Sequence, residues 1–157
     1  MNRCDFSFLN RPPKTVITLF LFALLMSGCE SKPPVPPGLV DGRLLPCPDT
    51  PNCVNSDSDH GDDVIQPLSF TGEPNDAFKR ARAAVIKTGG TLQSEGLKYL
   101  HATYVSTLFR FVDDLELRLD RQAGVIHIRS ASRIGRSDFG ANARRVKRLR
   151  KAFNNAS

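Results

Sequence analysis

The sequence lacks the short motifs that mark common catalytic sites. It contains no G-x-S-x-G, no H-E-x-x-H and no phosphate-loop pattern. Zinc-finger spacing, an RNA-binding signature and an aromatic-rich basic stripe are missing too, so nucleic acid is not predicted as a partner. We predict no metal ion and no other cofactor. These absences favour a protein without catalytic activity and leave an enzyme as an alternative.

Length and composition are those of one ordinary globular domain. The chain has 157 residues, of which 40% are hydrophobic and 24% charged. Setting aside residues 1–28 lowers the formal net charge from +6 to +4, because that segment carries Arg3, Arg11, Lys14 and Asp5. An excess of this size indicates tolerance of anionic surroundings.

No apolar run is long enough to span a bilayer, which takes about 20 residues. The longest, TVITLFLFALLM, has twelve. It follows a basic leader, as in a secretory signal. The run ends in residues 25–29, LMSGC, which resemble the lipobox of bacterial lipoproteins. The resemblance implies cleavage before Cys29 and acylation of that cysteine, with palmitate among the attached chains, which anchors a protein stably. An ordinary cleaved signal with a chance cysteine is the alternative.

The chain therefore divides into a signal peptide (1–28), a lipidated cysteine with a proline-rich tether (29–43) and one globular domain (44–157). The segment SKPPVPPG favours an extended spacer. Glu30, where an aspartate would resemble an inner-membrane retention signal, favours the periplasmic face of the outer membrane. We expect a protein of the bacterial cell envelope, held to its membrane by lipid.

Cysteine pairing follows from this division. Cys4 leaves with the signal and Cys29 is lipidated, so Cys47 and Cys53 remain for an oxidising compartment. We predict a disulfide that contributes about 2 kcal/mol. A thiol-redox site would favour a two-residue spacing, and a metal site that adds His60 lacks a fourth ligand.

Four aspartates follow the cysteines, and they predict a solvated acidic turn. They are Asp57, Asp59, Asp62 and Asp63. Their spacing is similar to the start of a calcium loop, but the glutamate that closes such a loop is missing. Calcium binding is therefore the less favoured alternative.

Two strand-like runs lie on either side of residues 121–124 and predict a hairpin. Pairing Asp120 with Val125 brings the leucines of the first run opposite the isoleucines of the second. The same register sets Glu116 opposite Arg129. A shift by one residue would place leucines against the polar face, so this register is favoured.

The remaining pattern predicts a second hairpin and two helices. The segments TLQSE and KYLHATYVS flank Gly96 as strands. A helix is predicted from about residue 74 to the glycines at 89 and 90, with its buried side made of Ala77, Phe78, Ala81, Val85 and Ile86. A last helix from about Phe139 to Phe153 is capped by Ser137 or Asp138. Its predicted buried stripe is Phe139, Ala143, Val146, Leu149 and Phe153. The fold class is α+β, an antiparallel sheet of about four strands with the two helices packed on one face.

The densest polar cluster lies between the last strand and the last helix. Its members are Arg129, Ser130, Ser132, Arg133, Arg136 and Ser137. Guanidinium groups beside a helix start can bind an anion. Alternatively, structural ion pairs occupy these arginines, and the candidate partners are Asp113, Asp114 and Glu116.

The last helix is strongly basic. Its cations are Arg144, Arg145, Lys147, Arg148, Arg150 and Lys151. They form either a solvated helix face or a contact surface for anionic lipid or another envelope partner.

Three blocks of sequence resemble domain-of-unknown-function family 1499. They are CPDTPNCVNS, STLFRFVDDLELRLD and IRSASRIGRSDFGANARRVKRLR, which together span about residues 44–153. The matching positions are Cys47, Pro51, Asn52, Cys53, Phe111, Asp113, Asp114, Arg129, Ser130, Ser132, Arg133, Gly135, Asp138, Gly140, Asn142 and Arg145. The resemblance implies a bacterial and often envelope-associated protein, and it implies no activity.

The function that we expect is a non-enzymatic envelope lipoprotein that binds an anionic ligand or partner through Arg129 and Arg133. One alternative is a small hydrolase or transferase that uses Asp113 or Asp114. Its second catalytic group would be a histidine, namely His101 or His127. The other alternative is a purely structural or assembly role.

Overall fold

The structure, a computed structural model, describes residues 37–61, 63–107 and 109–156. All of them belong to Ser31–Ser157, the second of two units into which the chain divides. The predicted signal peptide and Cys29 lie outside the described residues, so cleavage and lipidation stay predictions. No helix in the described ranges has the length and apolar character that crossing a membrane would take.

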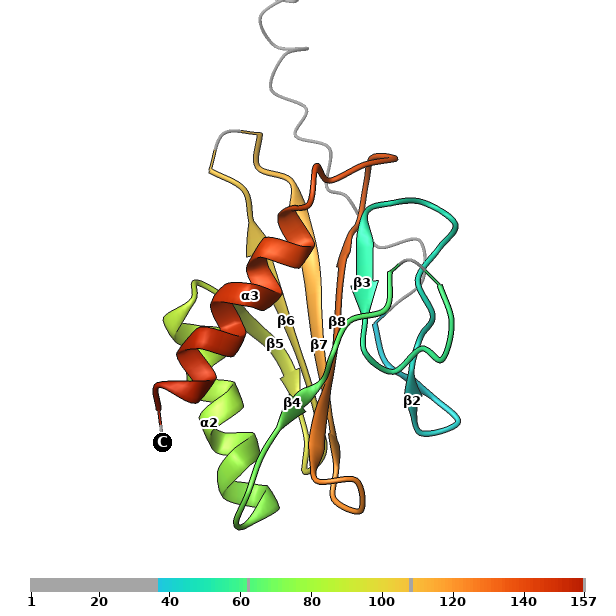
Figure 1. Cartoon of the computed structure of the whole chain (residues 1–157). Helices are drawn as coiled ribbons and strands as arrows, with labels where there is room; N and C mark the ends of the chain where they lie inside the picture. The colour runs from blue at the N-terminus through green and yellow to red at the C-terminus, as the bar shows by residue number, and fades with distance from the viewer. Residues whose placement is uncertain (1–36, 62, 108, 157) are drawn as a thin grey trace, which may run out of the picture. The chain divides into compact units, whose positions relative to one another are not determined.

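A six-stranded antiparallel sheet forms the centre of the fold (Figure 1). Its order is β3 (Cys53–Asn55), β8 (Val125–Ser132), β7 (Val112–Asp120), β6 (Tyr99–Val105) and β5 (Thr91–Glu95), and β4 (Leu68–Ser69) also pairs with β8. A separate pair consists of β1 (Leu39–Val40) and β2 (Arg43–Leu44). The α+β class is confirmed, but about four strands was too few. The missed strands are two or three residues long, too short to show a period of two.

The register of the central hairpin is the predicted one. Asp120 pairs with Val125, and Glu116 pairs with Arg129. The leucines of β7 and the isoleucines of β8 consequently share one face and are fully buried or nearly so. Matching of the two apolar faces is enough to specify this register.

Both helices pack on this apolar face. The helices are α2 (Pro74–Lys87) and α3 (Ala141–Asn154), and Figure 1 shows them on the same side of the sheet. One hydrophobic cluster joins their buried side chains to those of the sheet; its strand members include Leu100, Ala102, Leu115, Leu117, Ile126 and Ile128. On α2, Ala84 is buried in place of the predicted Ile86, which is exposed.

The start of α3 differs from the prediction. The helix begins at Ala141, because Phe139 and Gly140 adopt left-handed backbone conformations with φ of 51° and 76°. Phe139 is 88% exposed, and Ala143 is exposed as well. Asn142 and Arg145 are buried at this end of the helix instead. Hydrophobic spacing predicted the wrong buried residues for the first turn of α3. Polar side chains can be buried there because groups of β8 and of the disulfide loop provide their hydrogen-bond partners.

Asp138 still serves the helix start. Its carboxylate accepts hydrogen bonds from the backbone N–H groups of Gly140 at 2.9 Å and Asn142 at 2.7 Å. The predicted role of Asp138 at this helix start is therefore kept, although the residue at the cap position is Gly140.

The amino-terminal part of the described chain lies on the opposite, polar face of the sheet. Gly38 donates its backbone N–H to Glu116 on β7 at 2.8 Å, and Leu44 donates its N–H to Asp57 at 2.9 Å. Residues 39–44, which overlap the predicted tether, therefore already belong to the folded part.

The disulfide between Cys47 and Cys53 is confirmed, with a Cα–Cα distance of 5.7 Å. It closes a loop that carries Asn52. The Asn52 carbonyl accepts the N–H of Ser132 at 2.9 Å and the side-chain amide of Asn142 at 2.9 Å. The loop thus connects β8 to the start of α3.

We expect the double variant Cys47→Ser, Cys53→Ser to lose about 2 kcal/mol of unfolding free energy, because the open loop gains entropy in the unfolded chain. Urea denaturation of the parent and the variant measures the loss. A reducing agent should lower the parent's midpoint and leave the variant's midpoint unchanged. Equal stability of the two oxidised proteins would contradict a structural role for the disulfide.

Candidate functional site

Strand β7 carries three buried carboxylates. Asp113 is 7% exposed, Asp114 4% and Glu116 0%. Successive strand residues point to opposite faces, so Asp113 faces the helices, whereas Asp114 and Glu116 belong to the polar face. A buried carboxylate needs a cationic or hydrogen-bonding partner, and each of the three has an arginine.

Asp114 is held by Arg133 and His101. The guanidinium of Arg133 donates from Nε to Oδ2 at 3.0 Å and from Nη2 to Oδ1 at 2.9 Å. His101 Nε2 lies 2.7 Å from Oδ1, and it donates because an ionised carboxylate only accepts. Burial opposes ionisation of Asp114, but hydrogen bonds from His101 and Arg133 outweigh it and hold its pKa below the usual value. Asp114 is therefore an ionised carboxylate whose two oxygens already accept hydrogen bonds within the fold.

Glu116 has no exposed surface and accepts hydrogen bonds from three separate segments of the chain. Oε1 accepts the N–H of Gly38 and the hydroxyl of Tyr99, each at 2.8 Å, and Oε2 accepts from Arg129 at 2.9 Å. Burial, together with the nearby negative charge of Glu116, raises the pKa of Tyr99 well above its usual value. The tyrosine therefore stays protonated and donates to the carboxylate.

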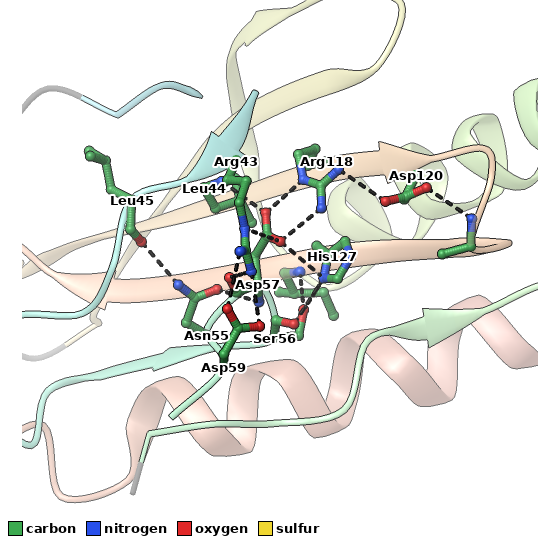
Figure 2. Close-up of polar contacts among 12 residues, drawn as sticks. Arg43, Leu44, Leu45, Asn55, Ser56, Asp57, Asp59, Arg118, Asp120 and His127 are labelled. Atoms are coloured by element: carbon green, nitrogen blue, oxygen red, sulfur yellow. Dashed lines mark hydrogen bonds and ion pairs between the residues drawn. The ribbon is translucent and has the colours of Figure 1, made fainter. Parts of the chain in front are cut away.

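Asp57 is the centre of a second polar cluster on this face (Figure 2). Arg118 on β7 donates to it twice, at 2.6 and 2.8 Å, and the N–H of Leu44 donates at 2.9 Å. Burial opposes its ionisation, but the bonds from Arg118 and Leu44 hold its pKa below the usual value. The expectation of a solvated acidic turn is wrong for Asp57, which is 5% exposed, and holds for Asp59, which is exposed.

His127 borders the Asp57 cluster (Figure 2). Its Nδ1 lies 2.9 Å from the carbonyl oxygen of Ser56 and 3.7 Å from Asp57. A carbonyl only accepts, so Nδ1 carries the hydrogen. The histidine thereby fixes the segment after β3 to β8, a positioning contact.

On the helix face, Asp113 pairs with Arg145 of α3. The guanidinium also stacks over the ring of Tyr104, with 4.8 Å from its central carbon to the ring centroid, and donates to Ser130 at 2.9 Å. Nearby, Asn142 is fully buried. Its amide donates to Ser132 at 3.1 Å and accepts from Ser130 at 2.7 Å.

The structure distributes the six predicted ligand-binding residues among three places. Arg129 and Arg133 lie on the polar face with their carboxylates, whereas Ser130 and Ser132 bond within the helix-facing network. Arg136 and Ser137 are exposed in the turn before α3. The alternation of β8 thus separates side chains that are adjacent in sequence, and they do not surround one common position.

The basic residues of α3 divide into two groups. Arg145 is paired with Asp113, and Arg150 donates to the backbone carbonyls of Gln66 and Pro67. Four remain exposed: Arg144, Lys147, Arg148 and Lys151. We call these four the α3 stripe. Within the described residues, none of the four forms an ion pair.

A hollow of about 620 Å³ lies beside the disulfide loop. The hollow is lined by three carboxylates, Asp49, Asp63 and Asp138, and by His60. Carboxylates repel an anion, so this hollow does not suit the predicted anionic ligand. In the described ranges, no group of three or more His, Cys, Asp and Glu side chains is placed to hold a metal ion.

Asp57→Asn should reduce the dependence of stability on pH in acid. A carboxyl whose folded pKa is depressed stabilises fully above its unfolded pKa, and this stabilisation is lost as the pH falls from about 4 through the folded value. At about pH 7 we expect a loss of about 3 kcal/mol, because the guanidinium of Arg118 loses both hydrogen bonds to the carboxylate of Asp57 and keeps, among the described carboxylates, only the 3.4 Å contact with Asp120. The loss should shrink below about pH 4.

Urea midpoints measured across this pH range test the prediction. The control is Asp76→Asn, which removes an exposed carboxylate that pairs with the exposed Lys79 and should change stability little. If the stabilities of the parent and Asp57→Asn differed by the same amount at every pH, the lowered pKa of Asp57 would be contradicted.

The comparison with protein families agrees with the resemblance seen in the sequence. The family model described as "Protein of unknown function (DUF1499)" matches residues 43–153. A search of curated proteins found no match. The matched region begins at Arg43 in β2 and ends at Phe153 in α3, so it contains the whole six-stranded sheet, α2 and all but the last residue of α3. The chain therefore belongs to domain-of-unknown-function family 1499.

Proposed function

We propose that the protein is a lipid-anchored lipoprotein of the bacterial envelope whose domain holds an anionic ligand or partner on the α3 stripe. The single observation that carries the proposal is the unequal use of the basic residues. Arg129, Arg133 and Arg145 neutralise buried carboxylates, whereas the α3 stripe has no acidic partner among the described residues. We therefore propose α3 as the binding surface, in place of the turn after β8 that the sequence suggested.

The spacing of the α3 stripe supports this role. Arg144, Arg148 and Lys151 follow at steps of four and three, and Lys147 lies four residues before Lys151, so all four side chains share one side of the helix. Cations gathered in this way attract an anionic surface by about 1 kcal/mol each, and the attraction decreases with added salt. The anchor rests on the sequence around Cys29, and outer-membrane placement rests on Glu30.

A hydrolase or transferase is the second candidate, and the contact between His101 and Asp114 favours it. A carboxylate that orients a histidine is a common catalytic arrangement. However, Arg133 also engages Asp114, and His101 is 8% exposed. This second candidate function would be supported if the protein hydrolysed an ester or a phosphate ester and if His101→Gln abolished the hydrolysis without unfolding the domain. A purely structural role is supported if neither turnover nor anion binding is found.

The triple variant Lys147→Gln, Arg148→Gln, Lys151→Gln tests the α3 stripe. We expect phospholipid headgroups, glycan phosphates or nucleotides to raise the thermal midpoint of the parent. Affinity should fall about a hundredfold in the variant, since three cations of about 1 kcal/mol each are lost. The substitutions are at exposed positions, so the fold should persist.

A matched control removes the same charge from the other helix: Lys79→Gln, Arg82→Gln, Lys87→Gln. The proposal predicts that this control binds like the parent at low salt and that high salt abolishes binding. Equal binding by the α3 variant and the parent would contradict the proposal. An equal loss of affinity in both triple variants would mean that binding depends on the net charge of the domain and not on the α3 stripe.

A further inference from the structure

Four large apolar side chains are exposed in the described part of two loops at one end of the sheet. They are Phe109, Phe111, Ile134 and Phe139, with exposed fractions of 66%, 47%, 45% and 88%. We call them the apolar tip. The first two lie in the loop from β6 to β7 and the others in the loop from β8 to α3, both at the upper end of Figure 1.

Strand pairing brings the two loops together. Val112, the first residue of β7, pairs with Val105, the last residue of β6. On its other side, the carbonyl of Val112 accepts the N–H of Arg133 at 3.2 Å. Phe111 and Ile134 are the next residues outward, so the loops leave from neighbouring strand ends.

The tip is ordered by its own hydrogen bonds. Ser106 accepts the N–H of Phe111 on its hydroxyl at 2.9 Å and the N–H of Arg110 on its carbonyl at 3.1 Å. The rings of Phe109 and Phe111 stack with centroids 5.5 Å apart. An aromatic surface held in this way binds with little further loss of conformational entropy.

Phe139 contributes no buried apolar surface to the core. Its side chain is the most exposed of the four, and its backbone is left-handed with φ of 51°, a region that residues with a side chain rarely occupy. Strain and lost burial at one residue point to a use outside the fold.

The exposed charged side chains in the two tip loops are arginines. Arg110 and Arg136 are exposed in the same two loops, and neither forms an ion pair within the described ranges. The nearby carboxylate of Asp138 accepts backbone N–H groups at the start of α3. Aromatic rings with flanking guanidinium groups fit the boundary between acyl chains and anionic headgroups.

We propose that the apolar tip inserts into the interface of the membrane that carries the lipid anchor, so that the domain stands on the bilayer and the α3 stripe stays free for its ligand. This inference rests on the proposed anchor at Cys29. Residues 30–37 separate Cys29 from Gly38, a stretch that reaches at most about 30 Å. Gly38 is bonded to Glu116, and Phe111 lies about 17 Å further along the strand direction at about 3.3 Å per residue. The tether therefore keeps the tip within reach of the bilayer.

Tryptophan reporters in the full-length lipidated chain, reconstituted into vesicles, test the insertion. The natural sequence has no tryptophan, so Phe139→Trp and, separately, Phe109→Trp each add a single fluorophore. The matched control is Leu97→Trp, because Leu97 is also 88% exposed but lies in the turn between β5 and β6, at the other end of β6. Vesicles contain either zwitterionic lipid alone or added anionic lipid, with bromine on the upper acyl chain as quencher.

We expect both tip reporters to be quenched at least about twice as strongly as Leu97→Trp, because an interfacial aromatic lies about 5–10 Å into the headgroup boundary. Quenching should increase with anionic lipid and decrease in Arg110→Gln, Arg136→Gln, while the α3 triple variant should keep it. A chain that floats with the vesicles but shows equal quenching at all three positions overturns the insertion and assigns the tip to a protein partner. A chain that does not float refutes the anchor instead, so the two failures are distinguishable.

Discussion

Burial of carboxylates on β7 is the constraint on which the rest of the structure depends. An ionised carboxyl taken out of water is costly unless a cation and hydrogen bonds replace its hydration. Asp113 obtains Arg145 from α3, Asp114 obtains Arg133 from beyond the end of β8, and Glu116 obtains Arg129 from within β8. The three carboxylates thereby fix α3, β8 and the segment that follows β8 to the central strand. Asp57 is the converse case, in which the carboxylate lies in the loop after β3 and its arginine partner, Arg118, lies on β7.

This pairing decides which basic residues remain for other partners. Arg129 and Arg133, the two arginines through which the sequence predicted anion binding, are neutralised by buried carboxylates of the fold. Cations that form no ion pair among the described residues, on the outer side of α3 and in the two tip loops, keep their charge and their exposure. The proposed ligand surface and the proposed membrane contact are therefore separate, one along the helix and one at the end of the sheet. A lipid anchor would bring both close to an anionic surface.

The sequence predicted those parts of the fold that depend on local periodicity. The central register followed from alternation, and α2 followed from its helical spacing and terminal signals. Three features depended on distant partners and were missed. Phe139 and Ala143 were assigned to the core by spacing, whereas Asn142 and Arg145 occupy it because Asp113, Ser130 and Asn52 bond to them. Strands β3 and β4 were too short for a pattern and form only along the free edge of β8. Asp57 looked like a surface residue because Arg118 lies 61 positions away.

A double-mutant cycle on Asp114 and Arg133 tests most directly whether these arginines belong to the fold. Unfolding free energies would be measured for the parent, Asp114→Asn, Arg133→Gln and the double variant. The structure predicts that each single change destabilises the domain and that the pair is coupled by about 1–3 kcal/mol, since each single variant removes the two hydrogen bonds between the guanidinium and the carboxylate. Additive effects within about 0.5 kcal/mol would mean that the two residues act independently. The division of the basic residues that underlies both proposals would then be wrong.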